Sequence, residues 1–307
     1  MAERNRSKRL TRADVVVIAA VCLLLTLLVP VLFGRPREQN MRRVCAANLA
    51  QIGKAMFLYA ADSAGNLPRA GGPTSSWGPT PNWVARDRRQ AFGLAADGSG
   101  GSASIGSSLY LLVKYLQIPP RIFICRADKG AVELRPAIRE DGAPAFQFAD
   151  VWDFGGSPES PRHCSYTYHI PYGLYYLSTS NDPNLAVAAD RSPWIKSPAA
   201  DPAEFALFKP DSGATGGTGT GDQACMGNSM THQRDGQNVL FLDGRVSFET
   251  RPYCGIDKDN IYTVSRQFMS GDPWGTLPVA APGLSPMNRK DSLLVHDPVP
   301  FVGDKRR

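Results

Sequence analysis

The longest apolar pattern in the chain is an uncharged run of 19 residues, Val15 to Phe33. As a helix this run rises about 28 Å, close to the ~30 Å hydrocarbon core of a bilayer. A cleaved signal sequence and a buried core helix are the alternatives, but the apolar region of a signal covers only ~7–15 residues and ends at a small-residue cleavage site. The following stretch "PVLFGRPREQ" offers no convincing site of that kind. We therefore predict a retained transmembrane helix over residues 15–33.

An amphipathic pattern follows directly, over residues 34–66. Its apolar residues recur every three to five positions and form one stripe on a helix: Val44, Leu49, Ile52, Met56 and Tyr59. Gly65 and Pro68 predict where this helix stops. Apart from Pro30 and the Gly34–Pro36 step there is no strong breaker, so Asp14–Ala61 can form one long helix, of which only the later half packs on a soluble domain.

The remaining pattern is one of short apolar runs between turns, consistent with 29 Gly and 25 Pro. The stretch "NVLFLDGRVSFE" predicts a β-hairpin with Asp243 and Gly244 as the two left-handed residues of a type I′ turn. One buried face of that hairpin is predicted to hold Val239, Phe241, Val246 and Phe248. The stretch "SLYLLVKYLQIPPRIFIC" predicts a short helix and then a buried strand, and "KDSLLVH" predicts an edge strand.

These elements predict an α+β fold, with the long N-terminal helix laid across an antiparallel sheet and with loop-rich insertions. The sheet domain is predicted to cover residues 67–270, including the hairpin at 232–250, and residues 271–307 to form an extended C-terminal tail. We predict no clear second domain.

The net charge of +6 is local. Residues 1–43 hold nine of the 34 basic and three of the 28 acidic residues, so the rest of the chain is neutral, with 25 of each. This distribution argues against a nucleic-acid partner. Basic residues flank both ends of the apolar run, but five of them precede residue 13, which predicts that residues 1–14 stay in the cytoplasm. The main domain would then lie outside the cytoplasmic membrane.

Candidate chemistry is sparse. His232 with Ser229 or Asp243 could form a triad-like set, but a strand of about five residues places the hairpin tip ~16 Å from its start. A surface hydrolase would need a pocket that brings His232 or His169 against a carboxylate and a nucleophile. We favour a structural role for the hairpin, and predict no catalytic residue and no enzyme activity.

The four histidines and six cysteines form no CxxC or HExxH pattern, so a zinc site would have to be assembled from distant ligands. Disulfides are favoured over such a site, with buried free thiols as the alternative. The glycine-rich stretches 93–108 and 213–222 lack the GK[ST] ending of a phosphate loop and are predicted to be flexible loops. Aromatic residues in irregular segments are predicted to pack in the core, with a stacking platform for a polysaccharide as the alternative.

Several stretches resemble one known group of proteins. In order they are "CAANLAQIGKAMFLYAADSAGNLP", "RIFICRADKG", "HCSYTYHIPYG", "LAVAADRSPW", "GQNVLFLDGRVSF" and "CGIDKDNIYT". Together with the apolar helix before them, they resemble prepilin-like proteins of type II secretion and type IV pilus systems, especially those with a C-terminal H-X9-DG domain that are abundant in Planctomycetes. The motif residues would be His232, Asp243 and Gly244, separated by one residue more than the motif name states.

The resemblance implies a pilin-like fold in a single-pass protein of the inner membrane, with its main domain periplasmic or extracytoplasmic. Its partners would be the bilayer and other pilin-like subunits or secretion-system proteins. An anchored ectodomain that binds polysaccharide is the alternative function.

The prepilin processing site departs from the family pattern. Arg9 stands where prepilins have glycine, Leu10 and Thr11 match loosely, and Asp14 replaces the glutamate that would pair with a neighbouring subunit's N-terminal charge. We therefore predict that the anchor is not cleaved.

Two further sites depend on this architecture. It places the long helix next to the "IFIC" segment, which predicts a Cys45–Cys125 disulfide; a bond from Cys164 or Cys225 to Cys254 is a weaker prediction. By analogy with major pseudopilins, Asp257 and Asp259 are weak calcium candidates, and no other cofactor is predicted.

Overall fold

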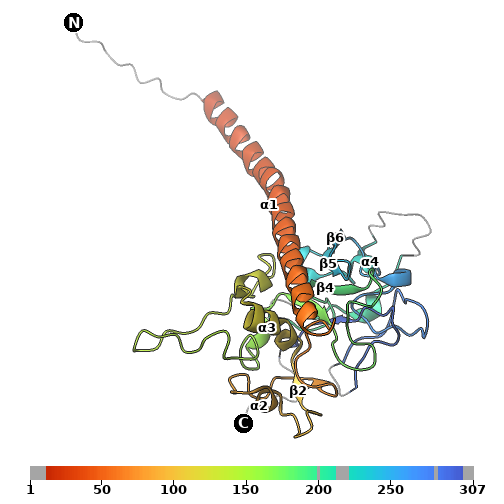
Figure 1. The fold of residues 1–307 in the computed structure, drawn as a ribbon. Helices are drawn as coiled ribbons and strands as arrows, with labels where there is room; N and C mark the ends of the chain where they lie inside the picture. The colour runs from red at the N-terminus through yellow and green to blue at the C-terminus, as the bar shows by residue number, and fades with distance from the viewer. Residues whose placement is uncertain (1–11, 199–200, 212–220, 280–282, 300–307) are drawn as a thin grey trace. The chain divides into compact units, whose positions relative to one another are not determined.

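The computed structural model describes residues 12–198, 201–211, 221–279 and 283–299, with only the backbone of residues 25–36. The chain divides into two compact units, residues 1–41 and 42–307. Helix α1 (Arg12–Asp62) is continuous over 51 residues, close to the predicted Asp14–Ala61 (Figure 1). Within the described part of the chain, one stretch of this N-terminal helix, Arg37–Asp62, is long and apolar enough to cross a membrane.

In the first unit, the described side chains of residues 12–24 are all exposed. Val15, Val16, Val17 and Ile18 are 55%, 68%, 60% and 49% exposed, although they are large and apolar. Four consecutive residues cover a full helical turn, so no side of this turn is shielded by protein. A helix that is apolar all round belongs in a protein core or in a membrane.

The second unit is built on a five-stranded antiparallel sheet with the order β6-β5-β4-β3-β7. The strands are β3 (Tyr166–His169), β4 (Ala186–Asp190), β5 (Gln237–Phe241), β6 (Val246–Glu249) and β7 (Leu294–Val295). The mixed helix-and-sheet class is therefore confirmed. The predicted edge strand is present as β7, so the C-terminal segment is part of the sheet rather than only an extended tail.

The other elements are short. They are β1 (Ser76–Trp77) and β2 (Ser102–Ala103), which pair in parallel, the helices α2 (Arg88–Phe92), α3 (Ile105–Leu116) and α4 (Asp222–Cys225), and the 3₁₀ helices η1 (Pro120–Phe123), η2 (Ser160–His163), η3 (Phe205–Leu207), η4 (Met230–His232) and η5 (Ile256–Lys258). The predicted strand at "IFIC" is wrong, because its first two residues, Ile122 and Phe123, belong to η1 and its last two belong to no strand. Pro120 begins η1, where its fixed φ favours a helical turn and its missing N–H has no partner to lose.

The later half of α1 packs on one face of the sheet. Cys45, Leu49, Ile52 and Met56 of α1 are buried in the same cluster as Leu240 and Leu242 from the hairpin. Gly53 allows this approach, since a Cβ atom there would lie 2.9 Å from Leu240 Cδ1. The predicted stripe is therefore rotated slightly: Val44 and Tyr59 are only half-buried, and Cys45 and Ala60 are buried.

The opposite face of the sheet carries a second cluster, which includes Val239 and Phe241 of β5 with Trp194, Phe208 and Tyr262 from loops. Strand β5 is therefore buried on both faces: Val239 and Phe241 share one of them, as predicted, and Leu240 is buried on the other. Its predicted companions on β6, Val246 and Phe248, are half-buried because β6 is an edge strand.

The hairpin turn also differs from the prediction. Gly244 N donates to Phe241 O (2.9 Å) and Phe241 N donates to Arg245 O (2.9 Å), which closes a three-residue loop. Gly244 has a φ of 85°, whereas Asp243 is not among the described non-glycine residues with positive φ. This pattern is a type I turn followed by a left-handed glycine, not type I′. Leu242 is buried and its N donates to Leu185 O (2.9 Å), which holds the turn against the protein.

Candidate functional site

Four side chains of metal-binding types meet in the interior of the second unit. Cys45 comes from α1, Cys125 follows η1, Asp190 ends β4 and His232 ends η4. Each is fully buried, with an exposed fraction of 0%. Their sulfur, nitrogen and carboxylate oxygen atoms lie within 4.8 Å of one another. Among the described residues, they are the group of three or more His, Cys, Asp or Glu side chains that could hold a metal ion. We call these four residues the buried cluster.

Cys45 and Cys125 are joined in a disulfide, with their sulfur atoms 2.17 Å apart and the two residues 80 positions apart in sequence. This is the pairing that the sequence predicts. His232 Nε2 lies 3.8 Å from Cys125 Sγ and 3.4 Å from Asp190 Oδ2. His232 thus lies beside the disulfide and a carboxylate. Its side chain belongs to the buried cluster and not to the hairpin tip.

Asn238 of β5 holds the carboxylate in place. Its backbone N donates to Asp190 Oδ2 (2.7 Å), and its Nδ2 donates to the same oxygen (3.1 Å) while lying 3.4 Å from His232 Nε2. The other oxygen, Asp190 Oδ1, is buried without a hydrogen-bond partner. Asp190 and Asn238 were both missed from sequence. The available signal was a carboxylate directly after the apolar strand "AVAA", where a buried charge needs a partner.

This arrangement does not favour surface hydrolysis. His232 lies against a carboxylate, as the hydrolase hypothesis requires, but the nearest sulfur is already bonded to Cys45. All four side chains are closed to solvent, so a substrate has no direct access to them. The cluster can instead hold segments together or, with its thiols reduced, hold a metal ion.

The hairpin-tip residues do not join the cluster. Asp243 Oδ1 accepts a hydrogen bond from Arg245 N (2.9 Å), so this carboxylate supports the turn. Ser229 Oγ donates to Thr231 Oγ1 (3.0 Å) and accepts from Thr231 N, which caps η4. The proposed triad of His232 with Ser229 or Asp243 is therefore not supported by these contacts.

The two calcium candidates, Asp257 and Asp259, have different surroundings and different partners. Asp257 pairs with Lys290 at 2.7 Å on the surface, whereas buried Asp259 accepts hydrogen bonds from the backbone N of Asp272 (3.1 Å) and Ser292 (2.9 Å). In the described ranges they do not converge with a third acidic ligand on one point. The observed contacts satisfy both carboxylates without calcium.

Other predicted site residues have separate positions. Arg9, Leu10 and Thr11 lie outside the described residues, and Asp14 lies in the first turn of α1. The predicted bonds to Cys254 are wrong: among the described cysteines, Cys22, Cys164, Cys225 and Cys254 are free. The sugar-platform alternative also gains no support, because most of the aromatic residues it would use are buried, including Trp77, Trp152, Tyr166, Tyr168 and Tyr172.

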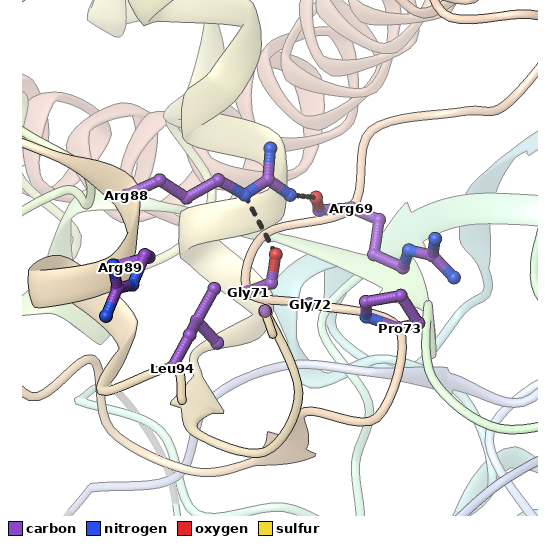
Figure 2. A pocket seen from close by; sticks show the side chains of 8 residues that line it. Arg69, Gly71, Gly72, Pro73, Arg88, Arg89 and Leu94 are labelled. Atoms are coloured by element: carbon purple, nitrogen blue, oxygen red, sulfur yellow. Dashed lines mark hydrogen bonds between the residues drawn. The ribbon is translucent and has the colours of Figure 1, made fainter. Parts of the chain in front are cut away.

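A surface pocket of about 320 Å³ carries three arginines, Arg69, Arg88 and Arg89, beside Gly71 and other loop residues. Figure 2 shows that Arg88 turns its guanidinium towards the loop backbone, where Nε donates to Gly71 O (2.9 Å) and Nη2 to Arg69 O (2.8 Å). Arg69 stacks over the Tyr176 ring at 5.0 Å. Two of the three charges therefore stabilise the loop itself, and the pocket is a weaker candidate than the buried cluster.

A second buried polar group surrounds the N-terminus of α3. Asp297 Oδ1 accepts from Ile105 N (2.8 Å) and Trp77 Nε1 (3.0 Å), and Asp153 Oδ2 accepts from Ser104 Oγ (2.6 Å) and Thr80 Oγ1 (2.7 Å). Burial, followed by the nearby charge of Asp297, raises the pKa of Asp153 to about 7. These carboxylates join the C-terminal segment to α3.

The raised pKa of Asp153 predicts a pH-dependent stability. Between about pH 4 and 7 the folded chain holds a proton on Asp153 that the unfolded chain has lost. The stabilisation that this proton gives the folded state is therefore full below pH 4 and disappears as the pH rises through 7. Asp153→Asn keeps the group neutral. Its free energy of unfolding, relative to wild type, should rise by roughly 2–3 kcal/mol between pH 5 and 8.

Urea unfolding at several pH values would measure this difference. The comparison with wild type matters because burial lowers the pKa of His169 to about 4 and that of His296 to about 3, which gives pH effects of opposite sign. Those effects are common to both proteins. A difference between Asp153→Asn and wild type that stayed constant from pH 5 to 8 would contradict the shifted pKa.

The fold and the buried cluster together define an α+β protein with an apolar N-terminal helix and a sealed disulfide site. Comparison with protein-family models, curated proteins and solved structures gives no match to this chain.

Proposed function

We propose that the chain is a single-pass, membrane-anchored, pilin-like envelope protein with a structural or assembly role and no enzyme activity. The observation that carries the proposal is that the apolar residues of α1 are exposed in its first part and buried in its later part. Residues 12–24 are exposed on all sides and mostly apolar, whereas later residues such as Leu49 and Ile52 are buried against the sheet. The first part of this helix would thus act as the anchor, and its later part packs in the core of the folded domain.

The anchor is assigned to the earlier part of α1, over residues 15–33. Among the described residues it is Arg37–Asp62 that has the length and hydropathy of a span, but 39% of its most apolar window is buried inside the protein. That stretch also includes Lys54 and Asp62, which a bilayer core would exclude. Val15–Phe33 carries no charge.

The disulfide supports an extracytoplasmic position for the second unit. Disulfides persist in oxidising compartments such as the periplasm and are rare in a reducing cytoplasm. The basic residues before the span favour a cytoplasmic N-terminus by the positive-inside rule. Both observations agree with the same orientation.

The anchor is tested by charging it. Ile18→Arg with Leu24→Arg should move most of the chain from the membrane fraction to the soluble fraction, because arginine is unfavourable inside a bilayer. Both positions are exposed, at 49% and 58%. The matched control is Leu58→Arg with Val84→Arg, at positions 61% and 56% exposed in the second unit, which should remain in the membrane fraction.

Orientation and assembly need separate readouts. Protease added to spheroplasts should degrade the second unit of the wild-type chain, and protection from protease would contradict the extracytoplasmic position. Chemical cross-linking in intact membranes should trap the chain with copies of itself or with other pilin-like subunits. Recovery of monomers alone would leave the anchor in place and contradict the assembly role.

A further inference from the structure

We propose that the buried cluster is a binding site for a zinc-like divalent metal ion when Cys45 and Cys125 are reduced, and that the disulfide is its oxidised, metal-free state. The inference goes beyond the envelope role and does not depend on it. It concerns four residues from four separate segments, Cys45, Cys125, Asp190 and His232, which the fold brings together.

The donor set fits such an ion. Two thiolates, one imidazole and one carboxylate supply four ligands, the usual number for structural zinc, and each is a ligand type that zinc accepts. Bonds of about 2.0–2.3 Å to a tetrahedral ion place its ligand atoms roughly 3.3–3.8 Å apart. His232 Nε2 already lies 3.4 Å from Asp190 Oδ2 and 3.8 Å from Cys125 Sγ.

A disulfide alone does not explain the other two residues. Two bonded sulfurs are uncharged and require no polar partner, yet a carboxylate and an imidazole, both 0% exposed, lie against them. Asp190 Oδ1 has no hydrogen-bond partner, although an unpaired buried carboxylate oxygen is unfavourable. A metal ion bound by this carboxylate would compensate its charge and would explain why it is buried at this point.

Asn238 acts as a positioning residue. Its two hydrogen bonds to Asp190 Oδ2 orient the carboxylate, and its amide lies 3.4 Å from His232 Nε2. Hydrogen bonds of this kind to ligand side chains commonly orient metal sites.

The two states exclude each other, because a sulfur must be a thiolate to bind the ion. Conversion requires an oxidant that meets the buried sulfurs when the reduced chain opens locally, and a small-molecule disulfide of the glutathione type suffices. One cysteine thiolate attacks it and releases a small thiolate; the second cysteine then attacks the mixed disulfide and releases another. Two electrons pass from the cysteine sulfurs to the small disulfide, two protons from water neutralise the released thiolates, and the ion loses two ligands and leaves.

The test uses the full chain in detergent, refolded without oxygen either with reductant or after oxidation, with Co²⁺ as the probe. The reduced chain should retain one Co²⁺ per molecule through gel filtration and show thiolate-to-cobalt charge-transfer absorption. The oxidised chain should retain none. Oxidised glutathione added to the loaded chain should release the Co²⁺ as the Cys45–Cys125 bond forms, and equal Co²⁺ in both states would overturn the proposal.

Variants locate the site. Asp190→Asn and His232→Gln should each weaken Co²⁺ binding at least tenfold, and Cys45→Ala with Cys125→Ala should abolish the charge-transfer absorption. The control is Cys164→Ser, a buried free cysteine outside the cluster, which should bind as wild type. Unchanged binding in Asp190→Asn, or lost binding in Cys164→Ser, would contradict the assignment.

A measurement on the wild-type chain avoids dependence on how the variants fold. Zn²⁺ should protect Cys45 and Cys125 of the reduced chain from alkylation by at least tenfold in rate, as read by peptide mass spectrometry. Alkylation of Cys225 and Cys254, which lie outside the cluster and are half-buried, should be unaffected by Zn²⁺. Equal rates at Cys45 and Cys125 with and without Zn²⁺ would overturn the proposal.

Discussion

Replacing both Cys45 and Cys125 by alanine should lower the free energy of unfolding of the oxidised chain by about 4 kcal/mol. The two positions are 80 residues apart, and the chain-entropy relation for a loop of that length gives roughly 4.5 kcal/mol. The bond also fastens α1 to the segment after η1, inside the larger core cluster. Urea unfolding of the full chain in detergent, followed by tryptophan fluorescence with a metal chelator present, measures the loss.

Reduction supplies the internal control. A reductant should bring the wild-type chain close to the stability of the double variant and should leave the double variant unchanged. Cys225→Ala with Cys254→Ala removes two half-buried free thiols and should cost less than about 1 kcal/mol. If reductant left the wild-type midpoint where it was, the disulfide would not be a main source of stability.

Local pattern was sufficient for the helix and for the hairpin strands. The end of α1 at Asp62 agrees with the signal from Gly65 and Pro68, because helix termination depends on residues within a few positions. Strands β5 and β6 likewise flank the Asp243–Gly244 pair. The turn type was wrong because it depends on Leu242, which a distant segment holds in place through Leu185 O.

Burial on both faces of β5 could not be read from its own residues. The second layer comes from Trp194, Phe208 and Tyr262, which lie in segments without helical or strand periodicity. A continuous apolar run such as "VLFL" is compatible with one buried face or two. Only the positions of those loop aromatics decide between them.

The candidate site was predicted in part for the same reason. The sequence predicts the Cys45–Cys125 pair from the expected neighbourhood of the long helix and the "IFIC" segment, and it indicates a structural role for His232 as a motif residue. Asp190 completes the cluster from a strand 42 positions before His232, as their residue numbers show. No spacing rule links four single residues from separate segments, so their convergence became visible only in the folded chain.

Asp128→Asn should lower the free energy of unfolding by about 3–5 kcal/mol, because it leaves the Arg191 guanidinium buried without its counter-charge. Arg191 Nε donates to Asp128 Oδ2 at 2.6 Å, and these side chains are only 4% and 3% exposed. Arg191 follows Asp190, and Asp128 lies three positions after Cys125. The ion pair therefore ties together two of the segments that form the buried cluster, and urea unfolding by tryptophan fluorescence would measure its loss.

Two comparisons separate the effect of losing the buried ion pair from the effect of losing any charged side chain. Glu159→Gln breaks the exposed pair with Arg162, whose side chains are 45% (Arg162) and 60% (Glu159) exposed, and should change stability by less than about 1 kcal/mol. Asp128→Leu combined with Arg191→Met removes both charges and should recover most of the loss, since neither partner is then left uncompensated. A loss in Asp128→Asn no larger than that in Glu159→Gln would show that the buried pair does not hold these segments together. A double variant as unstable as Asp128→Asn would instead assign the effect to packing and to the hydrogen bonds that Arg191 donates to Pro161 O and Cys164 O.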